Sequence, residues 1–214
     1  LGMVNAMGPF NLLQETLATK LARIDDIGGP DTHSNFPHGW AMTANTPLKR
    51  YKQNTHGGGI RDPLVVAWPK GVAARGALWN GFCHVSDLAP TVLDLLQLAP
   101  PAQVEGLPAQ PMTGSSFAAC LRDAATPWQR GPQYFEMFGH RGIWHEGWKA
   151  VAWHAVGTPF ESDQWELYHL DQDFSETRDL AAQHPEKLEA LQQLWWRQAE
   201  ANQVLPMDDR FAPR

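Results

Sequence analysis

Residues 49–69 read KRYKQNTHGGGIRDPLVVAWP, and this segment is the most informative part of the chain. A basic side chain, Lys52, precedes three successive glycines, and a short apolar run follows them. Glycine allows backbone dihedrals that are closed to other residues and lets N–H groups come close to a ligand. Lys52 adds a mobile positive charge. This order predicts a loop that holds a tetrahedral oxyanion, while a plain glycine turn before a strand explains the same glycines.

The apolar run from Leu64 to Trp68 is short and rich in β-branched residues. Such a run is typical of a strand that is buried on both faces of a largely parallel sheet.

The segment resembles the type I sulfatase, or arylsulfatase, family of the alkaline-phosphatase-like superfamily. In that family a lysine is followed by five residues, two glycines, an aliphatic residue and an arginine, and a later Trp-Pro ends the segment. The same order runs here from Lys52 to Arg61 and on to Trp68 and Pro69, without a gap. Further matches lie in residues 84–94, 114–117, 141–149 and 165–180, so the resemblance covers nearly the whole chain.

The resemblance implies an α/β fold that is the C-terminal part of an alkaline-phosphatase-like sulfatase. It ends in a small α+β unit with an antiparallel four-stranded sheet and a C-terminal helix. Residues 1–125 are then the C-terminal part of the large α/β domain, and residues 126–214 are the small subdomain. The prolines and glycine between Asp123 and Pro132 mark the expected boundary.

The function that the resemblance implies is sulfuric ester hydrolysis. In the family, a Cys or Ser in a C/S-x-P-x-R context becomes the formylglycine that attacks sulfur, and acidic residues hold calcium or a similar divalent ion. Neither pattern exists here, because no proline stands two residues after Cys83 or Cys120. We therefore interpret the chain as the C-terminal portion of a longer enzyme whose nucleophile and metal ligands lie upstream. We expect no cofactor within this chain and no activity from it in isolation. We also expect the apolar surface of the run from Leu64 to Trp68 to be exposed, because its sheet neighbours would come from that upstream portion.

Two residues are candidates for the site. Lys52 matches the family's lysine that contacts the sulfate oxygens, so the resemblance implies a catalytic and substrate-binding role for it. Fixed cations aimed at such oxygens lower the barrier of the reaction. His56 lies close enough in the sequence to bind the substrate as well, although a loop histidine that faces solvent fits this position equally well.

Composition excludes several classes of protein. A formal net charge of −6 argues against sequence-independent binding of nucleic acid. No apolar run approaches the roughly 18 residues of a membrane span. The histidine pairs His33 with His38 and His140 with His145 lack the spacing of a zinc site, so no metal site is predicted. The compartment stays open between cytoplasm and periplasm, because the chain begins at Leu1 and not at Met.

Hydrophobic periodicity and turn residues predict the remaining elements. We expect helices over residues 12–25 (with Asn11 as the N-cap), 87–97 and 116–122, a long loop over 28–49, strands over 134–138, 141–144, 148–154 and 165–170, and a last helix from Pro185. The four strands are rich in aromatic residues and separated by glycines, as in an antiparallel meander.

A second hypothesis comes from a different class. The chain's ten tryptophans also suit a non-catalytic carbohydrate-binding or regulatory module, and a related phosphodiester or phosphonate hydrolase is a close variant of the first hypothesis. The partners expected under the first hypothesis are a sulfate-ester small molecule and either the missing N-terminal portion or a second copy of the chain.

Overall fold

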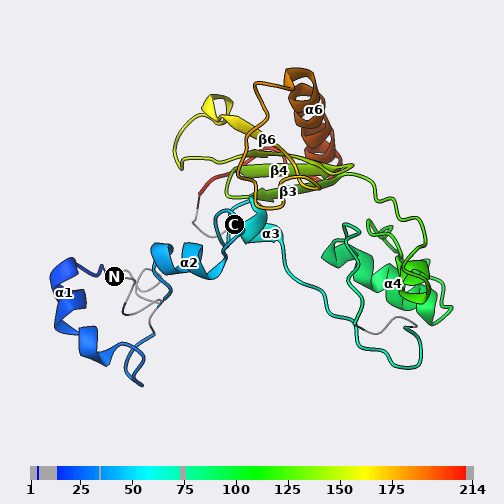
Figure 1. Cartoon of the computed structure of the whole chain (residues 1–214), viewed down its shortest axis with the longest axis horizontal. Helices are drawn as coiled ribbons and strands as arrows, with labels where there is room; N and C mark the ends of the chain where they lie inside the picture. Colours follow the sequence, from blue (N-terminus) through cyan, green and yellow to red (C-terminus); the bar gives the residue numbers. More distant parts are fainter. Residues whose placement is uncertain (1–3, 5–13, 34, 73–75, 211–214) are drawn as a thin grey trace.

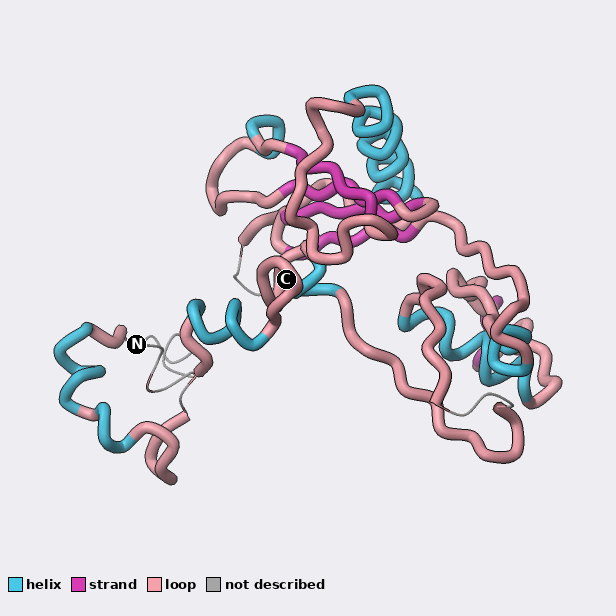
Figure 2. Tube along the Cα trace, in the orientation of Figure 1, coloured by secondary structure: helices cyan, strands magenta, loops and turns pink. Residues whose placement is uncertain are grey.

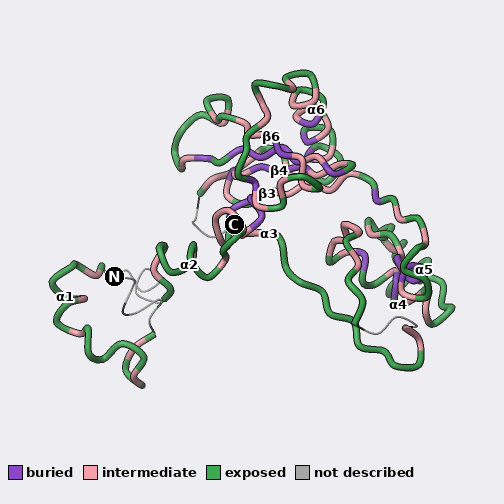
Figure 3. Tube along the Cα trace, viewed as in Figure 1, coloured by how far each residue is buried: buried purple, intermediate pink, exposed green. Residues whose placement is uncertain are grey.

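A computed structural model describes residue 4 and residues 14–33, 35–72 and 76–210. Figure 1 shows three parts: short N-terminal helices, a sheet with a long helix over it, and a helical segment that an extended connection joins to the sheet. Figure 3 shows that buried residues concentrate in the sheet part and in a small centre of the helical segment. The sheet part therefore contains most of the buried core of the described residues.

The sheet is an antiparallel meander of four strands in the order β3-β4-β5-β6. The strands are β3 Gln133–Met137, β4 His140–His145, β5 Trp148–Ala152 and β6 Trp165–His169. Gly139 and Gly147 close the first two hairpins at φ values of 84° and 78°, a region that glycine enters without steric cost. The predicted meander is confirmed, except that β5 ends at Ala152, because His154 leaves the sheet to bind Asp163.

Helix α6, Pro185–Ala201, packs on one face of this sheet. Pro185 occupies the first turn, where its missing N–H would have no partner within the helix. The buried core between α6 and the sheet consists of Ile143, Ala150, Leu167, Leu191, Trp195 and Ala199. The last three recur every four residues along α6 and so form one apolar stripe.

The two faces of the sheet differ in chemistry, because successive side chains of a strand point to opposite faces. Ala150 of β5 pairs with Leu167 of β6 on the face that α6 covers. The neighbouring pairs, Lys149 with Tyr168 and Val151 with Glu166, point to the opposite face. That face therefore carries charged and hydroxyl groups.

The helical segment, residues 76–132, is organised around a buried ion pair. It contains η3 Val85–Asp87, α4 Leu88–Leu95, the two-stranded pair β1 Gln103–Val104 and β2 Leu107–Pro108, and α5 Ala118–Arg122. The Nε–H of Arg130 donates to Asp87 at 2.7 Å, and the N–H of Ser115 donates to the other carboxylate oxygen. Burial alone would raise the pKa of Asp87, but the hydrogen bonds from Arg130 and from backbone N–H groups outweigh burial and lower it.

A stacked pair of rings connects this helical segment to the sheet. The ring centroids of Phe82 and Trp144 lie 3.8 Å apart, and the planes differ by 7°. Trp144 belongs to β4 and stands in register with Lys149, so the contact is on the face opposite α6. The helical segment therefore approaches the same polar face of the sheet.

Residues 61–69 form no strand (Figure 2). They run as an extended connection in which every residue is exposed, Val65 to 86%. The predicted strand from Leu64 to Trp68 is therefore wrong for this structure, because a strand needs a neighbour for its backbone groups and no described segment pairs with it. The predicted exposure of this apolar run is confirmed.

The N-terminal helices are shorter than predicted. They are α1 Leu17–Ala22, η2 Ile24–Asp26 and α2 His38–Ala44, and α2 lies inside the expected long loop. Thr16 caps α1 by accepting the N–H of Thr19, whereas the predicted cap, Asn11, lies outside the described residues. Across the part of the chain that the structure describes, no helix has the length and apolar character of a membrane span.

Candidate functional site

Lys52 stands on a loop, residues 49–56, that we call the Lys52 loop. The Oγ1–H of Thr55 donates to the backbone oxygen of Arg141 in β4 at 2.8 Å, which fixes the loop on the sheet. The side-chain amide of Asn45 donates to the backbone oxygens of Arg50 and Gly58, and so bridges the loop from α2's side. The loop is thus held from two directions.

The three glycines after the loop form one helical turn, α3 Gly57–Ile60. The N–H of Gly57 donates to Glu176, the N–H of Gly58 to the oxygen of Lys49, and that of Gly59 to the oxygen of His56. All three donors are used inside the chain. The prediction that these N–H groups approach a ligand is therefore wrong.

Close backbone approach explains why glycine is needed here. A Cβ atom on Gly58 would lie 2.0 Å from the backbone oxygen of Arg50, and one on Gly59 would lie 2.0 Å from that of Asn54. Neither glycine has a positive φ. The role of these glycines is thus to let the Lys52 loop fold tightly against α3.

Replacing Gly58 tests this close packing. We expect Gly58→Ala to lower the free energy of unfolding by about 1–3 kcal/mol, the usual cost of overpacking. Gly39→Ala is the matched control, because a Cβ atom there meets nothing within 4 Å and Gly39 lies in α2. Urea unfolding of both variants measures the difference, and equal losses would contradict this explanation.

His56 is buried, with 1% of its surface exposed. Its Nε2–H donates to Glu166 at 3.3 Å, because a carboxylate only accepts, and Nδ1 is left as an acceptor without a hydrogen-bond partner among the described residues. Burial lowers the pKa of His56, and the hydrogen bond to Glu166 opposes part of that shift. The interpretation of His56 as a solvent-facing histidine is wrong. Its contact with a substrate stays a prediction.

Glu166 is the charged centre of this face, and the sequence reasoning missed it. Its Oε2 accepts hydrogen bonds from the ammonium of Lys49 at 2.6 Å, from the hydroxyl of Tyr168 and from His56. Burial alone would raise the pKa of Glu166, but the hydrogen bonds from His56, Lys49 and Tyr168 outweigh burial and hold it well below its usual range. The sequence did hold one signal for Glu166: it lies two residues before Tyr168, and this spacing places both side chains on the same face of a strand.

A second ion pair lies beside Glu166. The ammonium of Lys149 donates to Glu176 at 2.5 Å, and the two side chains are 2% and 1% exposed. Burial lowers the pKa of Lys149, with Glu176 acting in the opposite direction. Among the acidic residues after β6, Asp173 accepts the backbone N–H groups of Thr177 and Arg178, whereas Glu176 pairs with the buried Lys149.

Lys52 itself is exposed in the middle of the loop. It lines a cavity of about 410 Å³ whose other lining residues include Phe36, Asn45, Tyr51 and Asp62. The cavity lies between α2 and α3, since Ala41, Ala44, Gly58 and Gly59 also line it. Lys52 is therefore accessible to a small anion, whereas His56 is not among the residues that line this cavity.

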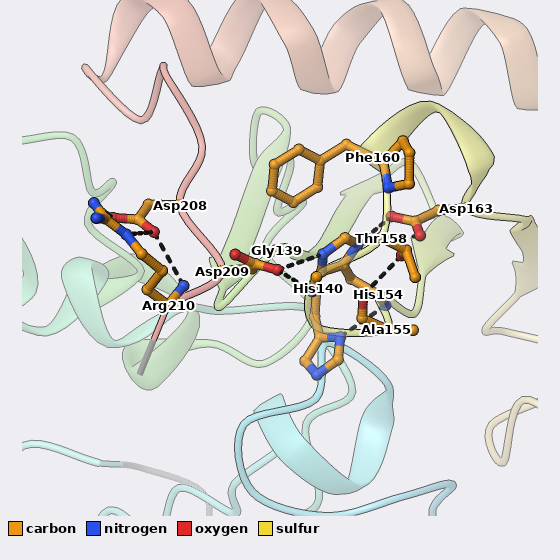
Figure 4. A network of polar contacts seen from close by, with 12 residues as sticks. Gly139, His140, His154, Ala155, Thr158, Phe160, Asp163, Asp208, Asp209 and Arg210 are labelled. Atoms are coloured by element: carbon orange, nitrogen blue, oxygen red, sulfur yellow. Dashed lines mark hydrogen bonds and ion pairs between the residues drawn. The ribbon is translucent and has the colours of Figure 1, made fainter. Parts of the chain in front are cut away.

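Two further histidines, His140 and His154, lie in structural contacts. Figure 4 shows His154 between two carboxylates, with Nδ1 2.9 Å from Asp163 and Nε2 3.3 Å from Asp209. His140 accepts the backbone N–H of His154, and burial, followed by the nearby His154 and Arg50, lowers the pKa of His140 to about 4. Within the described ranges, no group of three or more His, Cys, Asp or Glu side chains is arranged to hold a metal ion.

The chain matches the model of one protein family, described as N-sulphoglucosamine sulphohydrolase, C-terminal, over residues 49–203. The match extends from the start of the Lys52 loop to the end of α6, so it contains the anchored loop and the whole sheet.

Curated relatives are sulfatases. An uncharacterized sulfatase of Schizosaccharomyces pombe is 27% identical over 205 residues, which are 88% of this chain and 34% of that protein. A sulfatase of Formosa agariphila is 25% identical over 154 residues, which are 67% of this chain and 27% of that protein. The chain thus spans about a third or less of the length of these relatives.

Solved structures share the fold. The crystal structure of Ps i-CgsB superposes with a TM-score of 0.59 at 23% identity, over 78% of this chain and 35% of that one. The Bacteroides thetaiotaomicron protein BT33336S-sulf gives a TM-score of 0.52 at 19% identity, over 68% of this chain and 30% of that one. The predicted fold class is confirmed: the chain has the C-terminal part of a sulfatase fold, with the four-stranded sheet and the terminal helix.

Proposed function

Because the chain belongs to the N-sulphoglucosamine sulphohydrolase C-terminal family of sulfatases, we propose that it is the C-terminal segment of an arylsulfatase-like sulfuric ester hydrolase. The observation that carries the proposal is the position of Lys52, an exposed lysine on a loop that is anchored to the sheet and lines a cavity. In this role Lys52 binds the oxygens of the sulfate group.

The chemistry of the reaction suits a lysine at this position. A sulfate ester spreads its negative charge over its peripheral oxygens, and a cation that is already in place stabilises that charge without reorganisation. An ammonium group has three donors and no preferred plane, so it fits a tetrahedral group from several directions. The anchored loop limits the freedom of the lysine backbone, which reduces the entropy lost on binding.

The formylglycine and the divalent ion that sulfatases use do not fit the residues present. Neither Cys83 nor Cys120 stands in the required C/S-x-P-x-R context, and no described cluster of ligands suits a metal. We propose that both groups belong to a portion of the polypeptide upstream of Leu1. The shares of the relatives that this chain covers support a longer protein.

We propose that this upstream portion pairs with residues 61–69 and covers the apolar surface beside them. Val65, Leu78 and Val92 are exposed to 86%, 93% and 52%, and an extended apolar segment without a neighbour offers its backbone groups for pairing. Self-association through the same segment is the alternative when the chain is alone. The substrate in this proposal is a sulfate ester of a small molecule; Ps i-CgsB was crystallised with the carbohydrate k-i-k-neocarrahexaose.

Comparing the isolated chain with the full-length polypeptide tests the proposed division of the enzyme. We expect the purified 214-residue chain to show no turnover of an aryl sulfate and the full-length polypeptide to hydrolyse it, because the nucleophile lies upstream. Metal-dependent turnover by the isolated chain would overturn this division. A full-length protein that binds sugars but hydrolyses no sulfate ester would favour the carbohydrate-binding module, which the family match does not favour.

A further inference from the structure

The two ends of the Lys52 loop meet at one carboxylate oxygen. Lys49, the first residue of the loop, donates from Nζ to Oε2 of Glu166 at 2.6 Å. His56, the last residue, approaches the same oxygen through Nε2 at 3.3 Å. A single atom therefore holds both ends of the loop that carries Lys52.

The sheet keeps Glu166 in place. Glu166 lies in β6 opposite Val151 of β5, and the adjacent residue Leu167 belongs to the buried core under α6. Tyr168 donates its hydroxyl to Glu166 and accepts from Lys49 at 2.7 Å, which orients the carboxylate from the same strand. The anchor is thus part of the sheet whose other face packs against α6.

The backbone of the loop needs such an anchor. Arg50 and Gln53, which flank Lys52, have φ values of 64° and 76°. Residues other than glycine rarely adopt this left-handed region. They keep such dihedrals only where surrounding contacts hold the backbone in place. If its ends were released, the loop would relax to other dihedrals and move Lys52.

From these contacts we propose that Glu166 is a positioning residue that acts through Lys52: by binding Lys49 and His56, it sets the place of the Lys52 ammonium relative to the sulfate ester. This inference rests on the proposed function of Lys52. Glu166 makes no contact with the substrate in this proposal, and Thr55 provides a second attachment of the loop to β4.

The proposal is tested by a double-mutant cycle in the full-length polypeptide with an aryl sulfate. Glu166→Gln keeps the shape of the side chain and removes its charge, and we expect it to lower kcat about tenfold, since a small misplacement of a reacting group is costly. The double variant Glu166→Gln with Lys52→Ala is expected to be no slower than Lys52→Ala alone, because residues that act as a unit are not additive. Glu161→Gln, which replaces an exposed carboxylate of the same unit, is the control and should leave kcat unchanged.

Hydrogen exchange provides a second measurement that does not depend on activity. The amides of Asn54 and Gly58 are bonded to the oxygens of Tyr51 and Lys49, so they report on the closed loop. In Glu166→Gln we expect these two amides to exchange at least about tenfold faster, while the core strand amides keep their protection. Glu161→Gln should leave the exchange rates of the loop amides and of the strand amides unchanged.

Effects of Glu166→Gln and Lys52→Ala that multiply, an unchanged kcat in Glu166→Gln, or equal loss of protection in loop and strands each overturn the positioning role. If Lys52→Ala leaves kcat intact, the proposed function fails, and exchange at Asn54 and Gly58 still shows whether Glu166 holds the loop.

Discussion

Lys52→Ala in the full-length polypeptide is expected to lower kcat for an aryl sulfate about a hundredfold or more. This is the usual scale for removing one preorganised group that stabilises charge in the transition state. Because Lys52 is exposed and lies outside the buried core, the substitution should leave the thermal midpoint of unfolding unchanged. Steady-state kinetics at saturating substrate, together with thermal unfolding, separate loss of chemistry from loss of fold.

The matched control is Lys70→Ala, which removes another exposed lysine. Lys70 does not line the cavity beside Lys52, so its replacement should leave kcat unchanged. Unchanged kcat in both the Lys52 and the Lys70 variant would refute the assignment of Lys52. Equal loss in both would show that net charge, and not the position of Lys52, governs the rate.

Trp195→Ala is expected to produce the largest loss of stability, about 3–5 kcal/mol, the range found when a large core side chain is removed. Trp195 is fully buried between α6 and the sheet, and its Nε1–H donates to the backbone oxygen of Phe135 at 3.0 Å. The substitution leaves a cavity and removes the hydrogen bond to the Phe135 carbonyl. Urea unfolding followed by circular dichroism measures the change.

Trp196→Ala is the natural comparison, because the neighbouring ring is 41% exposed. Its loss of stability should be about 1 kcal/mol, since the ring gives up less buried area and leaves no closed cavity. If the two variants lose the same stability, α6 does not pack on the sheet through the stripe of Leu191, Trp195 and Ala199.

The sheet and α6 were predictable from the sequence, because their signals are local. Glycines at the hairpins, aromatic residues in short runs and a proline in the first turn of a helix each act within a few residues. The stripe of Leu191, Trp195 and Ala199 follows from helical spacing alone. The predicted strands differ from the observed ones only at their ends. There, a side chain such as His154 binds a partner outside the sheet.

The run from Leu64 to Trp68 shows where local signals fail. Its composition favours a strand, but pairing depends on a neighbour that no described segment supplies. The same holds for α1, where Leu17 and Leu21 are exposed to 66% and 50%. Composition specifies which residues prefer burial, and only the tertiary structure specifies whether a partner is present.

The candidate site was partly predictable. Lys52 was proposed from the register of a family motif, which requires only the order of residues, and its role stays a prediction. The anchors of its loop were not found, because His56 and Glu166 are separated by 110 positions and meet only in the folded chain. Burial of His56 follows from that distant contact and has no signal within the loop itself.

The most direct test of the account is a crystal structure of the full-length polypeptide with inorganic sulfate bound. We predict that the Lys52 ammonium lies about 2.7–3.2 Å from a sulfate oxygen, the range of a hydrogen bond, with Lys49 and His56 still on Glu166. A sulfate held entirely by other residues, with the Lys52 side chain directed into solvent, would contradict the central claim.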